Sequence, residues 1–237
     1  MAVQRLTLNQ IITQILNITG FDSSDVAPWE SDANLTVKIN MTTQKIGQKV
    51  ARIILGTGAD VSKGNVKLDM WRSSADSTAS TGAGNLVVSS GSSTVQLPAD
   101  YDHWKSFWDS DLEQWFYPIE RNHTQYMQRL LKRPPGPPEA IEILGYGGTN
   151  WQRQCTLYPT PPTGVTPSIT LDYWRIPAVM PGSDADNEYP DGDYKFHYLW
   201  VLEPVLELLR PDDAAYNRYK EVEQEMMLEL AATARSV

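Results

Sequence analysis

Residues 169–177 read ITLDYWRIP and mark the point at which a β-rich region gives way to helices. Runs rich in Ile, Thr, Tyr and Trp are typical of strands, and Pro177 ends this run because proline cannot donate to a sheet. Strand-like runs separated by turn signals come before it, whereas an acidic loop and helical patterns follow it. The stretch therefore predicts the last strand of a β region, near residues 168–175.

The residues that follow are predicted to form an acidic loop and two helices. The loop spans 182–193, and apolar residues with helical character fill 193–209, where Pro204 marks either a kink or the true start of the helix. A last helix is predicted over 212–234, with acids in its first turn, where the helix dipole favours them. Its apolar stripe consists of Ala215, Tyr219, Val222, Met226 and Leu230.

Two further helices are predicted at the N-terminal end. Thr7 and Gln10 have the spacing of a capping box, and Gly20 is suited to end this first helix. The second helix is predicted over 33–55, with its apolar face made by Ile39, Ile46, Val50 and Ile53.

A basic stripe lies beside that apolar face. It consists of Lys38, Lys45, Lys49 and Arg52, and no acid occurs between Asp32 and Asp60. Two interpretations stay open, namely a docking face for an acidic partner surface and an ordinary solvated helix face.

The middle of the chain predicts strands with a two-residue period. They are expected over 65–71, as two short strands within 86–97, as an aromatic pair within 101–117, and near 139–145, 152–158 and 168–175, with a short helix near 120–131. The fold class is therefore α+β. We expect a helical bundle of residues 1–60 and 193–237 and an inserted antiparallel, sandwich- or barrel-like region over 61–192.

The composition sets limits on function. The 237-residue chain has a formal net charge of −9, whereas proteins that bind DNA by its phosphates are usually basic. No run of about 18 apolar residues occurs and no secretory signal is recognisable, so neither membrane insertion nor export is expected. Cys155 is the only cysteine, which excludes an intrachain disulfide and fits a reducing cytosol.

No catalytic, cofactor or metal site is predicted. His103, His123 and His197 lie in no zinc-binding spacing, and Cys155 is expected to be a small core residue. The Gly145–Gly148 stretch lacks the Lys-Ser/Thr pair of a phosphate-binding loop. The acidic loop 182–193 lacks the glycine and the terminal glutamate of an EF-hand, so a solvated loop is expected.

The order of elements resembles that of one family. LPADY at 97–101 precedes the aromatic strand, ITLDYWRIP at 169–177 ends the β region, and LRPDDAAYNRY at 209–219 joins the last two helices. This order is similar to that of the head-to-tail adaptor (connector, head-completion) proteins of tailed bacteriophages, over nearly the whole chain.

The resemblance implies a structural virion protein that is not an enzyme. Made in the host cytoplasm, it would form a ring, usually of twelve copies, beneath the portal protein, continue the DNA channel without sequence-specific binding and offer a surface to a tail or nozzle protein. Docking to the portal is implied for roughly residues 211–237, and our hypothetical contacts there are Tyr216, Tyr219, Glu221, Glu225, Met226 and Leu230. The basic stripe is our hypothetical contact with the neighbouring subunit, because ring interfaces join two different surfaces.

Three alternatives stay open. A glycan-binding β-sandwich module would use exposed tryptophans such as Trp104 or Trp108. Another tail or nozzle component would attach to tail proteins and not to the portal. A hydrolase would have to use acids such as those at 184–193, although the sequence pairs none of them across a cleft.

Overall fold

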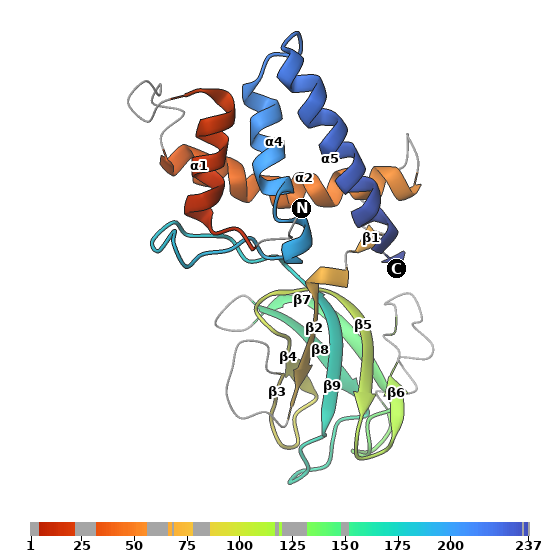
Figure 1. Cartoon of the computed structure of the whole chain (residues 1–237). Helices are drawn as coiled ribbons and strands as arrows, with labels where there is room; N and C mark the ends of the chain where they lie inside the picture. The colour runs from red at the N-terminus through yellow and green to blue at the C-terminus, as the bar shows by residue number, and fades with distance from the viewer. Residues whose placement is uncertain are drawn as a thin grey trace. The chain divides into compact units, whose positions relative to one another are not determined.

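The computed structural model describes residues 5–21, 32–55, 66–67, 69–77, 86–116, 119, 132–147, 152–233 and 235–236. The chain forms two compact units, one of residues 1–71 with 177–237 and one of residues 72–176. The first is helical and contains both ends of the chain, and the second contains two antiparallel four-stranded sheets (Figure 1). The predicted α+β class, with a β region inserted between terminal helices, is confirmed.

The described residues of the helical unit form four α-helices. They are α1 (Leu8–Thr19), α2 (Asp32–Leu55), α4 (Leu199–Leu208) and α5 (Ala214–Thr233). α4 lies between α1 and α5, and the long α2 runs across all three (Figure 1). Segments from the two ends of the sequence are thus brought into one bundle, as the sequence predicts.

The core of this unit comes from the apolar stripes of all four helices. α1 contributes its isoleucines, α2 the predicted Ile39, Ile46 and Val50, and α5 Met227 and Leu230. α4 is the most deeply buried helix, because every side chain from Leu199 to Val205 is buried. Ile53, predicted to belong to the same stripe of α2, is exposed instead.

The ends of α1 follow the predicted chemistry. Thr7 Oγ1 accepts from the Gln10 N–H at 3.2 Å, and Gln10 Oε1 accepts from the Thr7 N–H at 3.0 Å, so the capping box is confirmed. Gly20 ends the helix with φ +71°, a left-handed conformation that costs glycine little.

The region before α4 differs from the sequence prediction. Instead of one helix over 193–209, a 3-10 helix, η3 (Tyr194–Phe196), comes first and α4 begins at Leu199. Pro204 lies inside α4 and does not mark its start.

The second unit consists of two sheets. One has the order β2-β9-β5-β6 and the other β3-β4-β8-β7, with all neighbouring strands antiparallel. The apolar core of this unit includes Phe107, Phe116, Leu157 and Leu171. The strands are β2 (Arg72–Asp76), β3 (Val87–Val88), β4 (Thr94–Gln96), β5 (Tyr101–Asp109), β6 (Gln114–Phe116), β7 (Ala140–Gly147), β8 (Gln152–Tyr158) and β9 (Ile169–Arg175).

The predicted strand over 65–71 is largely wrong. Among the described residues of this stretch, Val66 and Lys67 form the strand β1, which pairs with β10 (Arg235–Ser236) near the end of the chain. A 3-10 helix, η2 (Asp69–Trp71), follows, because the Trp71 indole donates to the Asp191 carbonyl at 2.6 Å and turns this segment toward the helical unit. The predicted helix near 120–131 lies outside the described residues.

The acidic loop 182–193 packs with the helical unit. The Leu8 N–H donates to the Glu188 carbonyl at 2.8 Å, and the Asn9 N–H donates to the Ala185 carbonyl at 3.0 Å. The loop therefore satisfies donors at the start of α1, where the first turn has no partner within the helix. None of the helices that the structure describes is long and apolar enough to cross a membrane.

Candidate functional site

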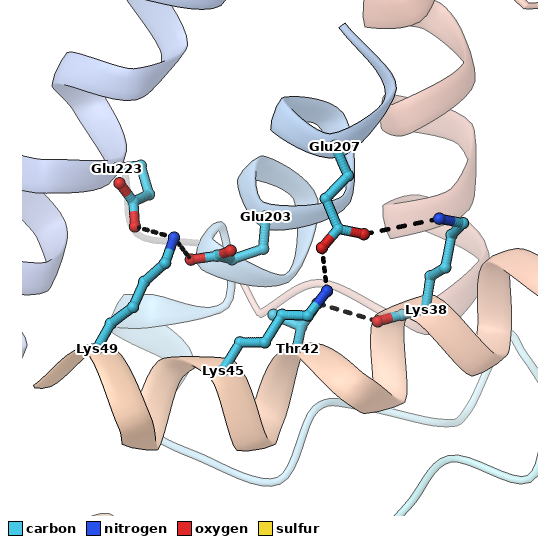
Figure 2. Close-up of polar contacts among 7 residues, drawn as sticks. All are labelled: Lys38, Thr42, Lys45, Lys49, Glu203, Glu207 and Glu223. Atoms are coloured by element: carbon cyan, nitrogen blue, oxygen red, sulfur yellow. Dashed lines mark hydrogen bonds and ion pairs between the residues drawn. The ribbon is translucent and has the colours of Figure 1, made fainter. Parts of the chain in front are cut away.

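An ion-pair network joins α2 to α4 and α5. Lys49 Nζ lies 2.5 Å from Glu203 Oε1 and 2.9 Å from Glu223 Oε1 (Figure 2). Glu203 comes from α4 and Glu223 from α5, so one ammonium group of α2 holds both C-terminal helices.

Both acids of this network are buried. Glu203 is only 4% exposed and Glu223 is also buried, so neither carboxylate has free access to water. Burial raises the pKa of Glu203, and the hydrogen bond from Lys49 opposes this shift. Burial alone would lower the pKa of Lys49, but its hydrogen bonds with Glu203 and Glu223 outweigh that effect and the pKa is raised.

A second, more exposed pair of contacts extends the network along α2. Glu207 of α4 is ion-paired with Lys45 and lies 3.6 Å from Lys38 Nζ (Figure 2). Thr42, between the two lysines, donates its hydroxyl to the Lys38 carbonyl at 3.1 Å. Because these charged groups are about one-third exposed, water and salt screen this part of the network.

The structure gives the predicted basic stripe a role within the chain. Lys38, Lys45 and Lys49 point toward acids of the same subunit, whereas Arg52 is exposed. The sequence interpretation missed Glu203, Glu207 and Glu223, because their partners lie 154 to 174 positions away in the sequence. Contact between the stripe and another subunit stays a prediction.

The residues proposed for portal docking lie on different sides of α5. Glu221 and Glu225 are exposed, whereas Leu230 is buried in the core of the helical unit. Tyr216, Tyr219 and Met226 are half-buried. The docking role of this set also stays a prediction.

The outer side of α2 carries no acid. Val37 and Met41 are 56% and 51% exposed. With them, at helical spacing, the exposed residues of this outer α2 face are Gln44, Gln48 and Arg52.

An aromatic pocket lies on the sheet β2-β9-β5-β6. Trp108 and Trp115 are cross-strand partners with ring centroids 4.7 Å apart, and Trp115 is 54% exposed. With Ser106, Thr170 and Asp172 they line an open pocket of about 240 Å³. Asp172 also accepts from Arg72 at 2.7 Å, so its charge is partly neutralised.

The described histidines, His103 and His197, and Cys155 pack against neighbouring residues of the chain. His197 is 2% exposed, its Nδ1 accepts from the Leu6 N–H at 3.2 Å, and its pKa is lowered chiefly by burial. His103 lies against Trp174, and His123 lies outside the described residues. Cys155 is a buried core residue, as predicted.

The acidic loop makes hydrogen bonds within itself. Desolvation raises the pKa of Glu188, but backbone hydrogen bonds from Asp184 and Gly182 outweigh it, so the pKa is lowered. Among the described residues, no group of three or more His, Cys, Asp or Glu side chains is placed to hold a metal ion.

Comparison with known proteins identifies the family. The model of the SU10 adaptor protein family matches residues 7–237, which is nearly the whole chain. No curated protein matches the chain significantly. The resemblance to phage head-to-tail adaptors is thereby confirmed. The chain belongs to the SU10 adaptor protein family and is a structural adaptor protein of a bacteriophage.

Proposed function

We propose that this protein is the head-to-tail adaptor that forms a ring beneath the portal, extends the DNA channel and provides the surface to which the tail or nozzle docks. The observation that carries the proposal is the family match over residues 7–237, which includes both units. By analogy with such adaptors the ring has twelve copies and belongs to the head-tail interface of the virion.

The helical unit supports this proposal. Its C-terminal helix α5 exposes acids along a 20-residue helix, and α5 is fixed to α2 through Glu223 and Lys49. A helix held rigidly in this way presents its outer side chains in a fixed geometry, which docking requires. We assign portal docking to residues 211–237.

The charge of the chain supports the channel role. With a net charge of −9, the surface repels DNA phosphates and does not hold them, so a genome can pass. We therefore expect no sequence-specific DNA binding.

Electron microscopy tests the proposal. Purified portal protein is mixed with this chain and imaged, with portal alone as the control. The expected result is an extra ring, coaxial with the portal and of twelve-fold symmetry. Binding to a tail or nozzle protein with no binding to the portal would contradict the proposal and support a tail component instead.

The aromatic pocket favours glycan binding as a second candidate function. Two tryptophans beside two hydroxyls and a carboxylate offer a stacking surface with polar groups at its edge. Trp104, considered from sequence, packs against the sandwich core, so Trp108 and Trp115 are the residues to test.

The glycan test is calorimetric titration with N-acetylglucosamine oligomers. Binding by the wild type that is lost in Trp115→Ala, but kept in the control Val87→Ala at an exposed strand position, would support this function. No heat of binding with the wild type would exclude these sugars as ligands.

A further inference from the structure

The sides of α2 differ in what they contact. The inner side, with Ile39 and Ile46, lies in the core. One flank carries Lys45 and Lys49, which pair with α4 and α5. On the opposite flank, Asn40 exchanges two hydrogen bonds with the Met180 backbone, at 2.8 and 2.9 Å. Over the described part of α2, the outer α2 face is therefore the side that is exposed to solvent in this subunit.

The outer α2 face is unusual for an acidic protein. From Val37 to Arg52 it combines the exposed apolar side chains of Val37 and Met41 with two glutamines, and its one charge is that of Arg52. Surfaces that are depleted in charge and rich in Met and Arg are typical of protein interfaces. A partner surface that fits it must be apolar in part and acidic.

The outer side of α5 has this character. Leu228 is 59% exposed, and Glu221 and Glu225 lie on the same side of the helix, with Arg218 toward its N-terminal end. The inner side, with Glu223 and Met227, faces the bundle. α5 packs against α2 by this inner side, so its outer side is turned away from α2, and the outer α2 face in turn lies away from the core that both helices share.

We propose that the outer α2 face of one subunit binds the outer side of α5 in the next subunit of the ring. Two different surfaces of one unit give a head-to-tail contact, which closes into a ring when the rotation allows it. This inference rests on the proposed ring function. It assigns Glu221 and Glu225 to the neighbouring subunit and leaves portal docking to the rest of residues 211–237.

The size of the face decides how the contact is tested. With a rise of about 1.5 Å per residue, Val37 to Arg52 span about 24 Å, and a width of about 10 Å gives roughly 240 Å². Each partner in a standard stable interface contributes about 800 Å². The contact is therefore too small to hold two free subunits together and is tested in the complex with the portal.

Cross-linking with a bismaleimide reagent tests the contact. In the double variant Met41→Cys/Leu228→Cys, bound to portal, we expect a ladder of covalent oligomers beyond the dimer. Each single variant alone should give at least tenfold less product. Cys155 adds no background, because it is fully buried and burial raises its pKa to about 12.

The outcomes separate the contact from the proposed ring. A ring visible by electron microscopy without a ladder would overturn the contact. So would dimers from Met41→Cys alone, which indicate a symmetric interface, or products that join Leu228→Cys to the portal. Absence of any ring on the portal would instead overturn the proposed function.

A charge comparison at one position gives a second test. Met41→Glu places an acid against the acidic side of α5, whereas Met41→Lys places a cation there. Both variants should fold, since the side chain is exposed, as circular dichroism can check. We expect ring occupancy on the portal to be at least tenfold lower for Met41→Glu than for Met41→Lys. Equal occupancy would contradict the proposed pairing.

Discussion

Lys49 is the shared cation of two buried carboxylates, and its removal should have a large effect on folding. In Lys49→Met, Glu203 and Glu223 lose their cation. Breaking a buried pair costs about 3–5 kcal/mol, and the partial exposure of Lys49 reduces this to about 2–3 kcal/mol at pH 7. Urea unfolding followed by circular dichroism measures the loss.

Lys45→Met is the matched control for that measurement. Its partner Glu207 is about one-third exposed, so we expect a cost below about 1 kcal/mol. Adding Glu203→Gln to Lys49→Met should recover part of the stability, because one uncompensated charge is removed. Equal losses for Lys49→Met and Lys45→Met would show that burial of the acids does not matter.

His197 predicts a pH dependence of stability. Burial lowers its pKa in the folded state, so the unfolded chain binds the proton more tightly. The contribution of His197 is fully present above the unfolded pKa of about 6.5 and is lost as the pH falls toward the folded pKa. The free energy of unfolding should therefore decrease below pH 6.5, by at most about 1.4 kcal/mol per pH unit from this group.

The variant His197→Asn isolates this effect. An amide oxygen can still accept from the Leu6 N–H, but the side chain does not titrate. Denaturant unfolding between pH 5 and 7 should show a smaller slope for the variant than for the wild type. Parallel slopes would assign the pH dependence to other groups.

At the scale of elements, the capping box of α1 makes a specific prediction. Thr7→Ala removes the acceptor of the Gln10 N–H and should lower the free energy of unfolding by about 1 kcal/mol. Thr13→Ala on the same helix is the control. The Thr13 hydroxyl donates to the Asn9 carbonyl, which is also the acceptor position of the backbone hydrogen bond within the helix, so its loss leaves no backbone group without a partner. Thermal unfolding of both variants measures the two losses of stability. Equal losses for Thr7→Ala and Thr13→Ala would show that the cap contributes nothing.

Most elements could be predicted from the sequence because their signals are local. The Thr7–Gln10 spacing, Gly20 and the strand runs that became β5, β8 and β9 each lie within one short segment. The 3-10 helix Asp69–Trp71 could not be predicted in this way, since the Trp71 indole is bonded to the carbonyl of Asp191, far along the chain.

The candidate site was predicted only in part, for the same physical reason. Helical spacing placed Lys38, Lys45 and Lys49 on one flank of α2, but the direction of that flank depends on acids of α4 and α5 far along the chain. The Trp108–Trp115 pair likewise depends on the register of β5 with β6, which composition does not reveal.

At the scale of the whole molecule, the two units can be tested for independence. Arg72, at the start of the sandwich unit, is paired with Trp174 near its end, so both connections leave from neighbouring strand positions. Paired strand residues lie about 5 Å apart. A chain in which a short Gly/Ser linker replaces 72–176 should therefore keep its helical circular dichroism and its binding to the portal.

A second excision distinguishes the two possible boundaries. Replacing the sequence-predicted insertion 61–192 also removes Trp71 and Met180, which contact the helical core. The loss of Met180 removes the backbone partner of Asn40 as well. We expect this chain to unfold at a clearly lower urea concentration than the one lacking 72–176. Equal stability would favour the boundaries predicted from sequence.

The pairing of Arg72 with Trp174 also bears on how such a gene can change. A segment whose ends are neighbours in space can be exchanged by recombination for one of another length, because the remaining protein keeps the same two attachment points. Codons 72–176 are thus expected to diverge fastest among lineages. The codons of α2, α4 and α5, joined through Lys49, are expected to be inherited together.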